Sequence, residues 1–485
     1  MEPATDSEKF PNDPKIDTDP SQSDDSSTDA PAINDTEKQP QADLGSEESH
    51  RKEERDIGGW KWVVVVLAIY SSQFLFALDQ TIVANVQPAI VEQFNAVDRL
   101  SWVSVAFLIG AAGTNLERPL HVGGAGLVWD SSATWRWSFY INLCVGAVCA
   151  PVYLFMLPNK DPRRGTGLAN RARELDYLGT IILLGAFFSG VMAVSFGGVM
   201  YSWDSGRIIG LFCCSGVLFI LFGVQQAYAI FTTPVHRIFP VEFLKSRIIL
   251  ILFAMTGAGG TAIFLPIYMT PLYFQFSRGD GALQSGVRLL PFIMLMIFAT
   301  ISNGAILFKV GYYMPWYLVG GILVVIGGAL MFTVDTATSV SSIYGYTVLI
   351  GIGAGLFCQG SFSIGQAIVK PEIVAASIGF ISTGQISGTT LALALANAVF
   401  LNKSEDGIMA ILPNTPIAEI QQTITEARST LFDNLSADDR QRVMDVIVSA
   451  LSSTYALVIT AGLLVTVLSL LLKRDRLFVT PAAAA

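Results

Sequence analysis

The chain has 485 residues, of which 52% are hydrophobic and only 14% are charged, whereas soluble globular proteins average about 25% charged residues. Residues 1–56 hold 17 acidic and 6 basic side chains, a net charge of −11, and the other 429 residues hold 22 acidic and 24 basic ones. So few charges cannot cover the surface of a soluble domain of this size. The composition predicts an all-α polytopic membrane protein with an acidic tail and excludes water-soluble enzyme folds.

Residues 1–56 form the acidic tail. They are rich in Asp, Glu, Ser, Pro and Gln and nearly devoid of aromatic side chains, so they cannot bury enough apolar surface to offset the entropy lost on folding. We expect this tail to be disordered. It has no apolar core like that of a cleavable signal peptide, so the first apolar segment is expected to direct membrane insertion.

Apolar runs of about 20 residues, the length needed to cross the hydrocarbon core of a bilayer, follow the tail. A shorter run, residues 101–115, is counted as a further span. The longer runs cover residues 60–82, 136–157, 177–199, 207–231, 248–274, 286–308, 314–334, 343–369, 373–401 and 446–472. Together they predict about eleven membrane-spanning helices.

The placement of lysine and arginine predicts the orientation, because basic connecting segments stay in the cytoplasm. Basic residues near residue 55, in segment 158–176 and after residue 472 place both termini inside, whereas segment 402–445, with 8 acidic and 4 basic residues, is predicted outside. Every connection after residue 158 agrees with strict alternation. The N-terminus and segment 158–176 are both predicted inside, so the chain between them should cross the membrane an even number of times. Three spans are predicted there. Either one of them does not cross, or an odd number of helices is absent from this region.

Metal, nucleotide and redox chemistry are not indicated. The three histidines are scattered and the five cysteines lie in apolar runs without the spacing of a zinc site or a disulfide. No Gly-Lys dipeptide occurs, which excludes a phosphate-binding Walker A loop. We therefore expect no cofactor, no ATP and no nucleic acid as partners, and any transport must be driven by an ion gradient.

Asp79 is an ionisable residue within the first apolar run. A charge inside the membrane costs several kcal/mol unless it is neutralised or paired, so such a residue is expected to be functional. Because burial favours the protonated form of a carboxyl group, Asp79 is the candidate for proton coupling. The alternative is a carboxylate that touches water at the end of its helix.

Amide side chains within the apolar runs are candidates for the lining of a substrate cavity, although such amides also bond neighbouring helices. These residues are Gln73, Gln275, Gln359, Gln366 and Gln385. Gly384 and Gly388 form a small-residue face that permits close helix packing. Arg136, which lies between two tryptophans, is predicted to anchor its helix at the membrane interface, and Arg288 is predicted to extend its charge to the membrane surface.

The segment predicted outside contains two Asn-X-Ser sequons, so Asn402 and Asn434 are candidates for N-glycosylation. It also carries apolar residues at spacings of three and four, which predict an amphipathic helix resting on the bundle or on the membrane. These residues are Ile417, Ile420, Ile424, Ala427, Leu431 and Leu435.

Several motifs resemble those of fourteen-span drug:proton antiporters of the major facilitator superfamily. Residues 78–88 (LDQTIVANVQP) resemble the first-helix signature, residues 135–143 (WRWSFYINL) the opening of the sixth helix, and residues 285–291 (SGVRLLP) the link between helices nine and ten. The matches are most specific for fungal toxin and secondary-metabolite exporters. The resemblance implies a coupling role for Asp79 and structural roles for Arg136 and Pro88.

Family helices three, four and most of five have no counterpart, because only residues 116–129 separate the end of helix two from the start of helix six. The chain thus resembles a major facilitator bundle with about 11 of 14 helices, as an incorrect exon junction or a splice product would give. The implied parts are an incomplete N-terminal lobe at 57–157, two linking helices at 177–231, a C-terminal lobe at 248–472 with its outer segment 402–445, and a cytoplasmic tail at 473–485.

The resemblance implies proton-coupled efflux of a hydrophobic small molecule, a drug or a fungal metabolite or toxin, with the lipid bilayer as the protein's surroundings. Both termini are expected in the cytoplasm and the protein in the plasma membrane, with the vacuolar membrane as the alternative. Two other functions remain open: a non-transporting truncated product or regulatory remnant, and a proton-coupled importer of siderophores or amino acids on the same fold.

Overall fold

The computed structural model describes residues 59–61, 63–68, 71, 137–156, 174–198, 200–234, 237–425, 435–472, 474, 476 and 477. Across these ranges the chain is helical apart from turns and one isolated bridge between Gly197 and Tyr201. Eight of the described helices are long and apolar enough to cross a membrane. The predicted fold class, an all-α polytopic membrane protein, is confirmed.

The predicted spans from residue 177 onward coincide with these eight helices. Residues 136–157 correspond to helix α4 (Trp137–Phe155), whereas span 101–115 and most of span 60–82 lie outside the described residues. The helices after α4 are α6 (Tyr177–Phe196), α7 (Gly206–Tyr228), η2 (Val241–Lys245), α8 (Arg247–Arg278), α9 (Ala282–Val287), α10 (Leu290–Val310) and α11 (Met314–Phe332). They are followed by α12 (Val340–Phe357), α13 (Gly360–Ala367), η3 (Pro371–Ile373), α14 (Val374–Ile411), α15 (Ile417–Thr425), α17 (Ala437–Thr454) and α18 (Ala456–Leu470).

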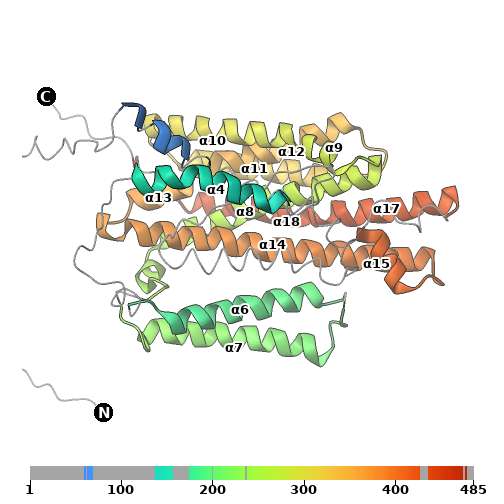
Figure 1. The fold of residues 1–485 in the computed structure, drawn as a ribbon, viewed down its shortest axis with the longest axis horizontal. Helices are drawn as coiled ribbons and strands as arrows, with labels where there is room; N and C mark the ends of the chain where they lie inside the picture. The colour runs from blue at the N-terminus through green and yellow to red at the C-terminus, as the bar shows by residue number, and fades with distance from the viewer. Residues whose placement is uncertain are drawn as a thin grey trace, which may run out of the picture. The chain divides into compact units, whose positions relative to one another are not determined.

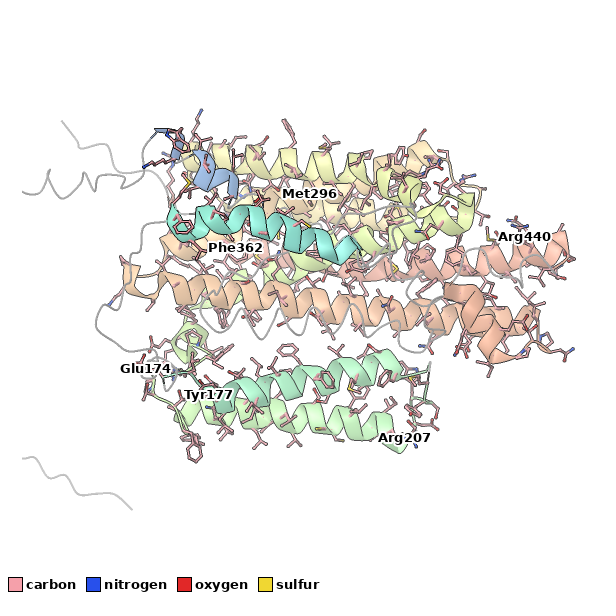
Figure 2. The ribbon with its side chains drawn as sticks, viewed as in Figure 1. Glu174, Tyr177, Arg207, Met296, Phe362 and Arg440 are labelled. Carbon is pink, nitrogen blue, oxygen red and sulfur yellow. The ribbon has the colours of Figure 1, made fainter. Side chains whose placement is uncertain are left out.

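Polar side chains at the helix starts set several of these boundaries. Asp176 accepts a hydrogen bond from the backbone N–H of Gly179 at the start of α6, at 2.9 Å, and Ser205 accepts one from Ile208 at the start of α7. Such caps satisfy backbone donors that have no partner within the helix. Helices α6 and α7 then run antiparallel, with Glu174 and Tyr177 at one end of the pair and Arg207 at the other (Figure 2).

Glycines bring the remaining helices into close contact. A methyl group added to Gly353 of α12 would lie 2.6 Å from the carbonyl oxygen of Gly320 in α11, and one added to Gly355 would lie 2.5 Å from that of Met296 in α10. Helix α12 is therefore held between α10 and α11, as Figure 1 shows. Without a hydrophobic drive between helices in lipid, such close backbone approach is a main source of association.

Helices α8 and α14 meet at a second glycine contact, which we call the α8–α14 glycine interface and define by Gly257, Gly384 and Gly388. A methyl group on Gly388 would lie 2.6 Å from the Cα of Gly257, and one on Gly384 would lie 2.6 Å from the carbonyl oxygen of Phe253. The two backbones therefore touch without intervening side chains.

Helix α14 is longer than predicted. The sequence suggested a span ending at residue 401, but the helix continues to Ile411 and is 38 residues long, or about 57 Å at 1.5 Å per residue. Its extension packs against α15 and α17 through fully buried Ile408, Ile420 and Ile447. The predicted amphipathic helix is confirmed over Ile417–Thr425, whereas Ala427 and Leu431 lie outside the described residues.

Candidate functional site

A cavity of about 780 Å³ lies between the α6–α7 pair on one side and helices α8, α14 and α18 on the other. We call it the α6–α14 cavity. Aliphatic side chains and glycines form most of its wall, and four phenylalanines add rings: Phe187, Phe212, Phe219 and Phe253. None of the described residues that line it is ionisable. The cavity is thus large, apolar and uncharged along its described wall.

Four hydroxyl groups interrupt this apolar wall. Ser215 donates to the carbonyl oxygen of Ala186 at 2.8 Å, Thr261 to that of Gly257 at 3.3 Å, and Thr460 to that of Leu457 at 2.9 Å. The Oγ atom of Ser387 is buried and has no hydrogen-bond partner. Because neighbouring atoms cover this oxygen, the hydroxyl of Ser387 does not face the cavity.

The α6–α7 pair contacts the rest of the bundle at both ends of the cavity. Near the start of α6, four phenylalanine rings form a chain of contacts. The centroid distances are 6.1 Å from Phe222 to Phe239, 5.1 Å from Phe239 to Phe380, and 4.7 Å from Phe380 to Phe253. Near the end where α6 stops, the amide of Asn402 donates to the carbonyl oxygen of Gly197 at 3.2 Å. Between these contacts, Val191 and Val194 of α6 pack against Ala394 and Ala398 of α14, and the cavity lies beside this contact.

A buried acidic cluster, which we define by Asp176, Gln225 and Gln226, ties the start of α6 to the end of α7. Asp176 is 3% exposed; Gln225 donates to its Oδ1 atom at 3.0 Å and Gln226 to its Oδ2 atom at 2.7 Å. The backbone N–H of Phe239 in turn donates to the side-chain oxygen of Gln226 at 2.9 Å. The cluster thereby fixes the connection from α7 toward α8.

Replacing Asp176 with Asn is expected to lower the free energy of unfolding by about 3 kcal/mol, because an amide group would face the amide donors of Gln225 and Gln226 and leave buried donors without an acceptor. Thermal unfolding in detergent, followed by tryptophan fluorescence, measures the change. The matched control is Asp438→Asn: that carboxylate is 75% exposed and pairs with Arg442 at 3.0 Å, so about 0.5 kcal/mol or less should be lost. Equal losses in the two variants would contradict the structural role of the cluster.

Arg288 has an acidic partner in the connection between α8 and α9. Its guanidinium group pairs with both carboxylate oxygens of Asp280, lies 4.8 Å from the ring centroid of Phe274 and donates to the hydroxyl of Tyr344 at 3.4 Å. The side chain of Asp280 is only 6% exposed. The pair joins the ends of α8, α10 and α12, a partnership the sequence did not reveal.

The other predicted site residues fall into two groups. Gln73, Asp79, Pro88, Arg136 and Asn434 lie outside the described residues. Of the others, Gln359 and Gln366 are exposed, and none of the four described glutamines lines the α6–α14 cavity.

Gln275 and Gln385 contact neighbouring side chains instead. Gln275 donates to Ser285 at 3.1 Å, and Gln385 lies 3.5 Å from the Sγ atom of Cys358. Gly384 and Gly388 do line the cavity, and they also form the α8–α14 glycine interface. Sequence reasoning searched for polar groups, whereas this wall consists of small and aromatic side chains.

Asn402 has a packing role in the structure. Its side-chain nitrogen, the atom that would carry a glycan, donates to the carbonyl oxygens of Gly197 and Ala398, and Ser404 of the same sequon is fully buried. These contacts argue against a glycan at Asn402 in the folded chain and leave Asn434 as the candidate.

Comparisons with known proteins agree with the transporter-like bundle. The family model of the Major Facilitator Superfamily matches residues 122–393. The MFS-type transporter pgmG of Aspergillus terreus is 39% identical over 524 residues, covering 90% of this chain and 94% of that protein. Efflux pump alnA of Emericella nidulans is 39% identical over 516 residues, covering 89% of this chain and 93% of that protein.

A third relative belongs to a biosynthetic gene cluster. The phomenoic acid biosynthesis cluster MFS-type transporter of Leptosphaeria maculans is 34% identical over 542 residues, covering 92% of this chain and 86% of that protein. All three alignments are longer than the 485 residues of this chain. The relatives therefore contain internal residues that have no counterpart here.

Proposed function

Because this chain belongs to the Major Facilitator Superfamily, and is thus a multi-span membrane transporter and not an enzyme, we propose that it exports a hydrophobic small molecule in exchange for protons. The cargo class is a fungal secondary metabolite or toxin. The observation that carries the proposal is the α6–α14 cavity, whose volume of about 780 Å³ and apolar wall suit a hydrophobic molecule. The names of the related efflux pumps support the direction of transport.

The proposed organisation follows the sequence analysis. Residues 57–157 form an incomplete N-terminal lobe, residues 177–231 the two linking helices α6 and α7, and residues 248–472 the C-terminal lobe. Transporters of this kind change access by movement of one helix bundle against another around a binding site near the bilayer midplane. Asp79 is the proposed proton carrier, and the plasma membrane, with both termini in the cytoplasm, is the proposed location.

One observation favours a second candidate function. The relatives contain internal residues that this chain lacks, and the sequence places the gap between residues 116 and 129, where family helices three to five are expected. A chain without these helices would be a non-transporting product or a regulatory remnant. Import of a siderophore or an amino acid, the other alternative, requires recognition of a polar molecule, which the uncharged wall of the cavity does not favour.

Expression in yeast cells that lack their own drug pumps tests efflux directly. Cells loaded with the fluorescent hydrophobic dye Nile red should lose it several times faster with this chain than with an empty vector, because the pump moves dye outward against its gradient. Collapse of the proton gradient with a protonophore should abolish the difference.

Two controls define the outcome. An epitope tag at the C-terminus confirms that the protein reaches the membrane, and a variant with a filled cavity, Ala392→Trp, should retain membrane insertion but lose the added efflux. If the chain reaches the membrane in normal amounts and dye loss equals that of the vector, export is wrong and the non-transporting alternative is favoured.

A further inference from the structure

We propose that a groove between the start of α8 and the end of α18 binds an anionic phospholipid. The lipid's phosphate group lies against Lys245 and Arg247, and one of its acyl chains lies between the two helices. We call this hollow, which has a volume of about 410 Å³, the α8–α18 groove. The inference goes beyond export, because it concerns the lipid around the protein and does not depend on the cargo.

The wall of the α8–α18 groove is aliphatic except at one end. The aliphatic side chains come from η2, α8 and α18 and are Leu244, Leu250, Ile251, Ala254, Leu468 and Leu471. An acyl chain can pack against these side chains without leaving a polar group unpaired, whereas a charged headgroup cannot lie among them without a large desolvation cost. The headgroup must therefore lie at the other, basic end of the groove.

The groove lies where both helices reach the membrane surface. Helix α8 begins at Arg247, directly before the apolar run 248–274, and α18 ends at Leu470, shortly before the basic residues of segment 473–476. The positive-inside rule predicts that this end of the bundle is cytoplasmic. The cytoplasmic leaflet is the one that carries anionic lipids and attracts basic side chains near its surface.

Two cations without an acidic partner mark the basic end. Lys245 and Arg247 line the groove and are exposed, and neither forms an ion pair or a hydrogen bond with another residue that the structure describes. Glu242, the nearest acidic residue in the sequence, is not part of the lining and pairs with Arg237 at 3.6 Å. The two positive charges are therefore free to bind an anion from outside the chain.

The backbone of α8 adds to this positive potential. Its first turn contains no acidic residue, and the side chain of Ser246 makes no capping hydrogen bond. Leu250 donates to the carbonyl oxygen of Ser246 at 3.1 Å, so the N–H groups before Leu250 have no partner within the helix. Because a helix start carries partial positive charge, Arg247 is unfavourable there unless an anion lies nearby. A phosphate group would meet both the cations and the N–H groups.

The combination of charge and apolar wall distinguishes one class of lipid. A free phosphate ion would satisfy the basic end but leave the aliphatic wall empty. A zwitterionic lipid such as phosphatidylcholine fills the wall, but its ammonium group offsets the attraction between its phosphate and the two cations. An anionic lipid such as phosphatidylserine supplies both a chain and a net negative charge.

Photolabelling of the full chain tests this proposal in phosphatidylcholine nanodiscs. Each sample contains a low density of phosphatidylserine or phosphatidylcholine that carries a diazirine in one acyl chain, and mass spectrometry locates the labelled residues. Labels from phosphatidylserine should concentrate on residues 250–254 and 468–471. One basic side chain strengthens binding to anionic lipid about fivefold, so the groove should prefer phosphatidylserine over phosphatidylcholine about 25-fold.

Three variants define the role of the two cations. In Lys245→Gln/Arg247→Gln the preference should fall to about one, whereas Lys245→Arg/Arg247→Lys should keep it. The matched control, Lys309→Gln/Lys370→Gln, also removes two exposed charges at the predicted cytoplasmic side, but neither lies in the groove lining. This control should keep the full preference. Thermal unfolding should give the same midpoint for the groove variant and the parent, because Lys245 and Arg247 make no contact that holds the fold.

The outcomes that contradict the proposal are specific. A preference that survives in Lys245→Gln/Arg247→Gln, or that falls as much in Lys309→Gln/Lys370→Gln, would show that the groove cations do not select the lipid. Labels spread evenly over the lipid-facing helices would show that there is no site.

Glycerophosphoserine, the headgroup without acyl chains, should leave the labelling unchanged when it is added at the concentration of the lipid. Loss of labelling at that concentration would show that the site binds a free anion and that the acyl chain contributes nothing. The assay involves no transport, so a protein that fails to export dye can still confirm the lipid site, and a pump that exports dye can still disprove it.

Discussion

Replacement of Gly388 with Leu is expected to abolish recovery of folded, monodisperse protein, and Gly388→Ala to lower the free energy of unfolding by about 2–3 kcal/mol. A Cβ atom at this position would lie 2.6 Å from both the Cα and the carbonyl oxygen of Gly257. These atoms belong to the backbone of α8 and cannot rotate away, so the two helices must separate. Overpacking of a well-packed interface typically costs 1–3 kcal/mol, and the larger side chain exceeds that range.

Size-exclusion chromatography in detergent and thermal unfolding measure this effect. The matched control is Gly304→Ala in the middle of α10, where no atom lies within 4 Å of the added Cβ. That change should be neutral or stabilise the helix by up to about 1 kcal/mol, because alanine has the higher helix propensity. Equal loss of folded protein in Gly388→Ala and Gly304→Ala would show that close backbone contact between α8 and α14 does not hold the bundle together.

Replacement of Asp79 with Asn is expected to reduce proton-driven efflux of Nile red to the level of cells without the protein. Asn cannot release a proton, so its side chain stays neutral in every state of the transport cycle and the coupling between proton entry and cargo exit is lost.

Asp204→Asn is the control for this prediction. Asp204 is an exposed acid in the turn between α6 and α7, and a hydrogen bond from the Ser202 side chain lowers the pKa of its carboxyl group below the ordinary value. This group therefore stays ionised throughout the neutral pH range and cannot carry protons there, and its replacement should leave efflux unchanged. Full efflux by the Asp79→Asn protein would rule out Asp79 as the proton carrier.

The membrane-spanning helices could be predicted because their signal is local. Runs such as 177–199 and 314–334 are apolar throughout, and the bilayer sets their minimum length. The end of α14 could not be predicted in this way. Residues 402–411 include Lys403, Glu405 and Asp406, so they end the apolar run, yet the helix continues because α15 and α17 cover its apolar face.

The candidate site was harder to predict because its contacts join distant parts of the chain. The sequence gives no sign that Asp176 is paired, because its partners Gln225 and Gln226 lie 49 and 50 residues away. The hydroxyl-bearing residues of the wall gave no signal, since serine and threonine are common in membrane helices. The cavity itself is lined by small and aromatic side chains, which have the same appearance in sequence as ordinary packing residues.

The long α14 has a practical consequence for imaging. The hydrocarbon core is roughly 30 Å thick and accommodates only about half of the 57 Å length of α14. The portion that packs with α15 and α17 therefore extends beyond the lipid as a rigid protrusion, which we call the ledge. A nanobody raised against this ledge would supply the fiducial mass that single-particle cryo-electron microscopy needs to align so small a particle. Because the same helix carries Ser387, the position of the fiducial would also report tilting of the cavity wall between conformations.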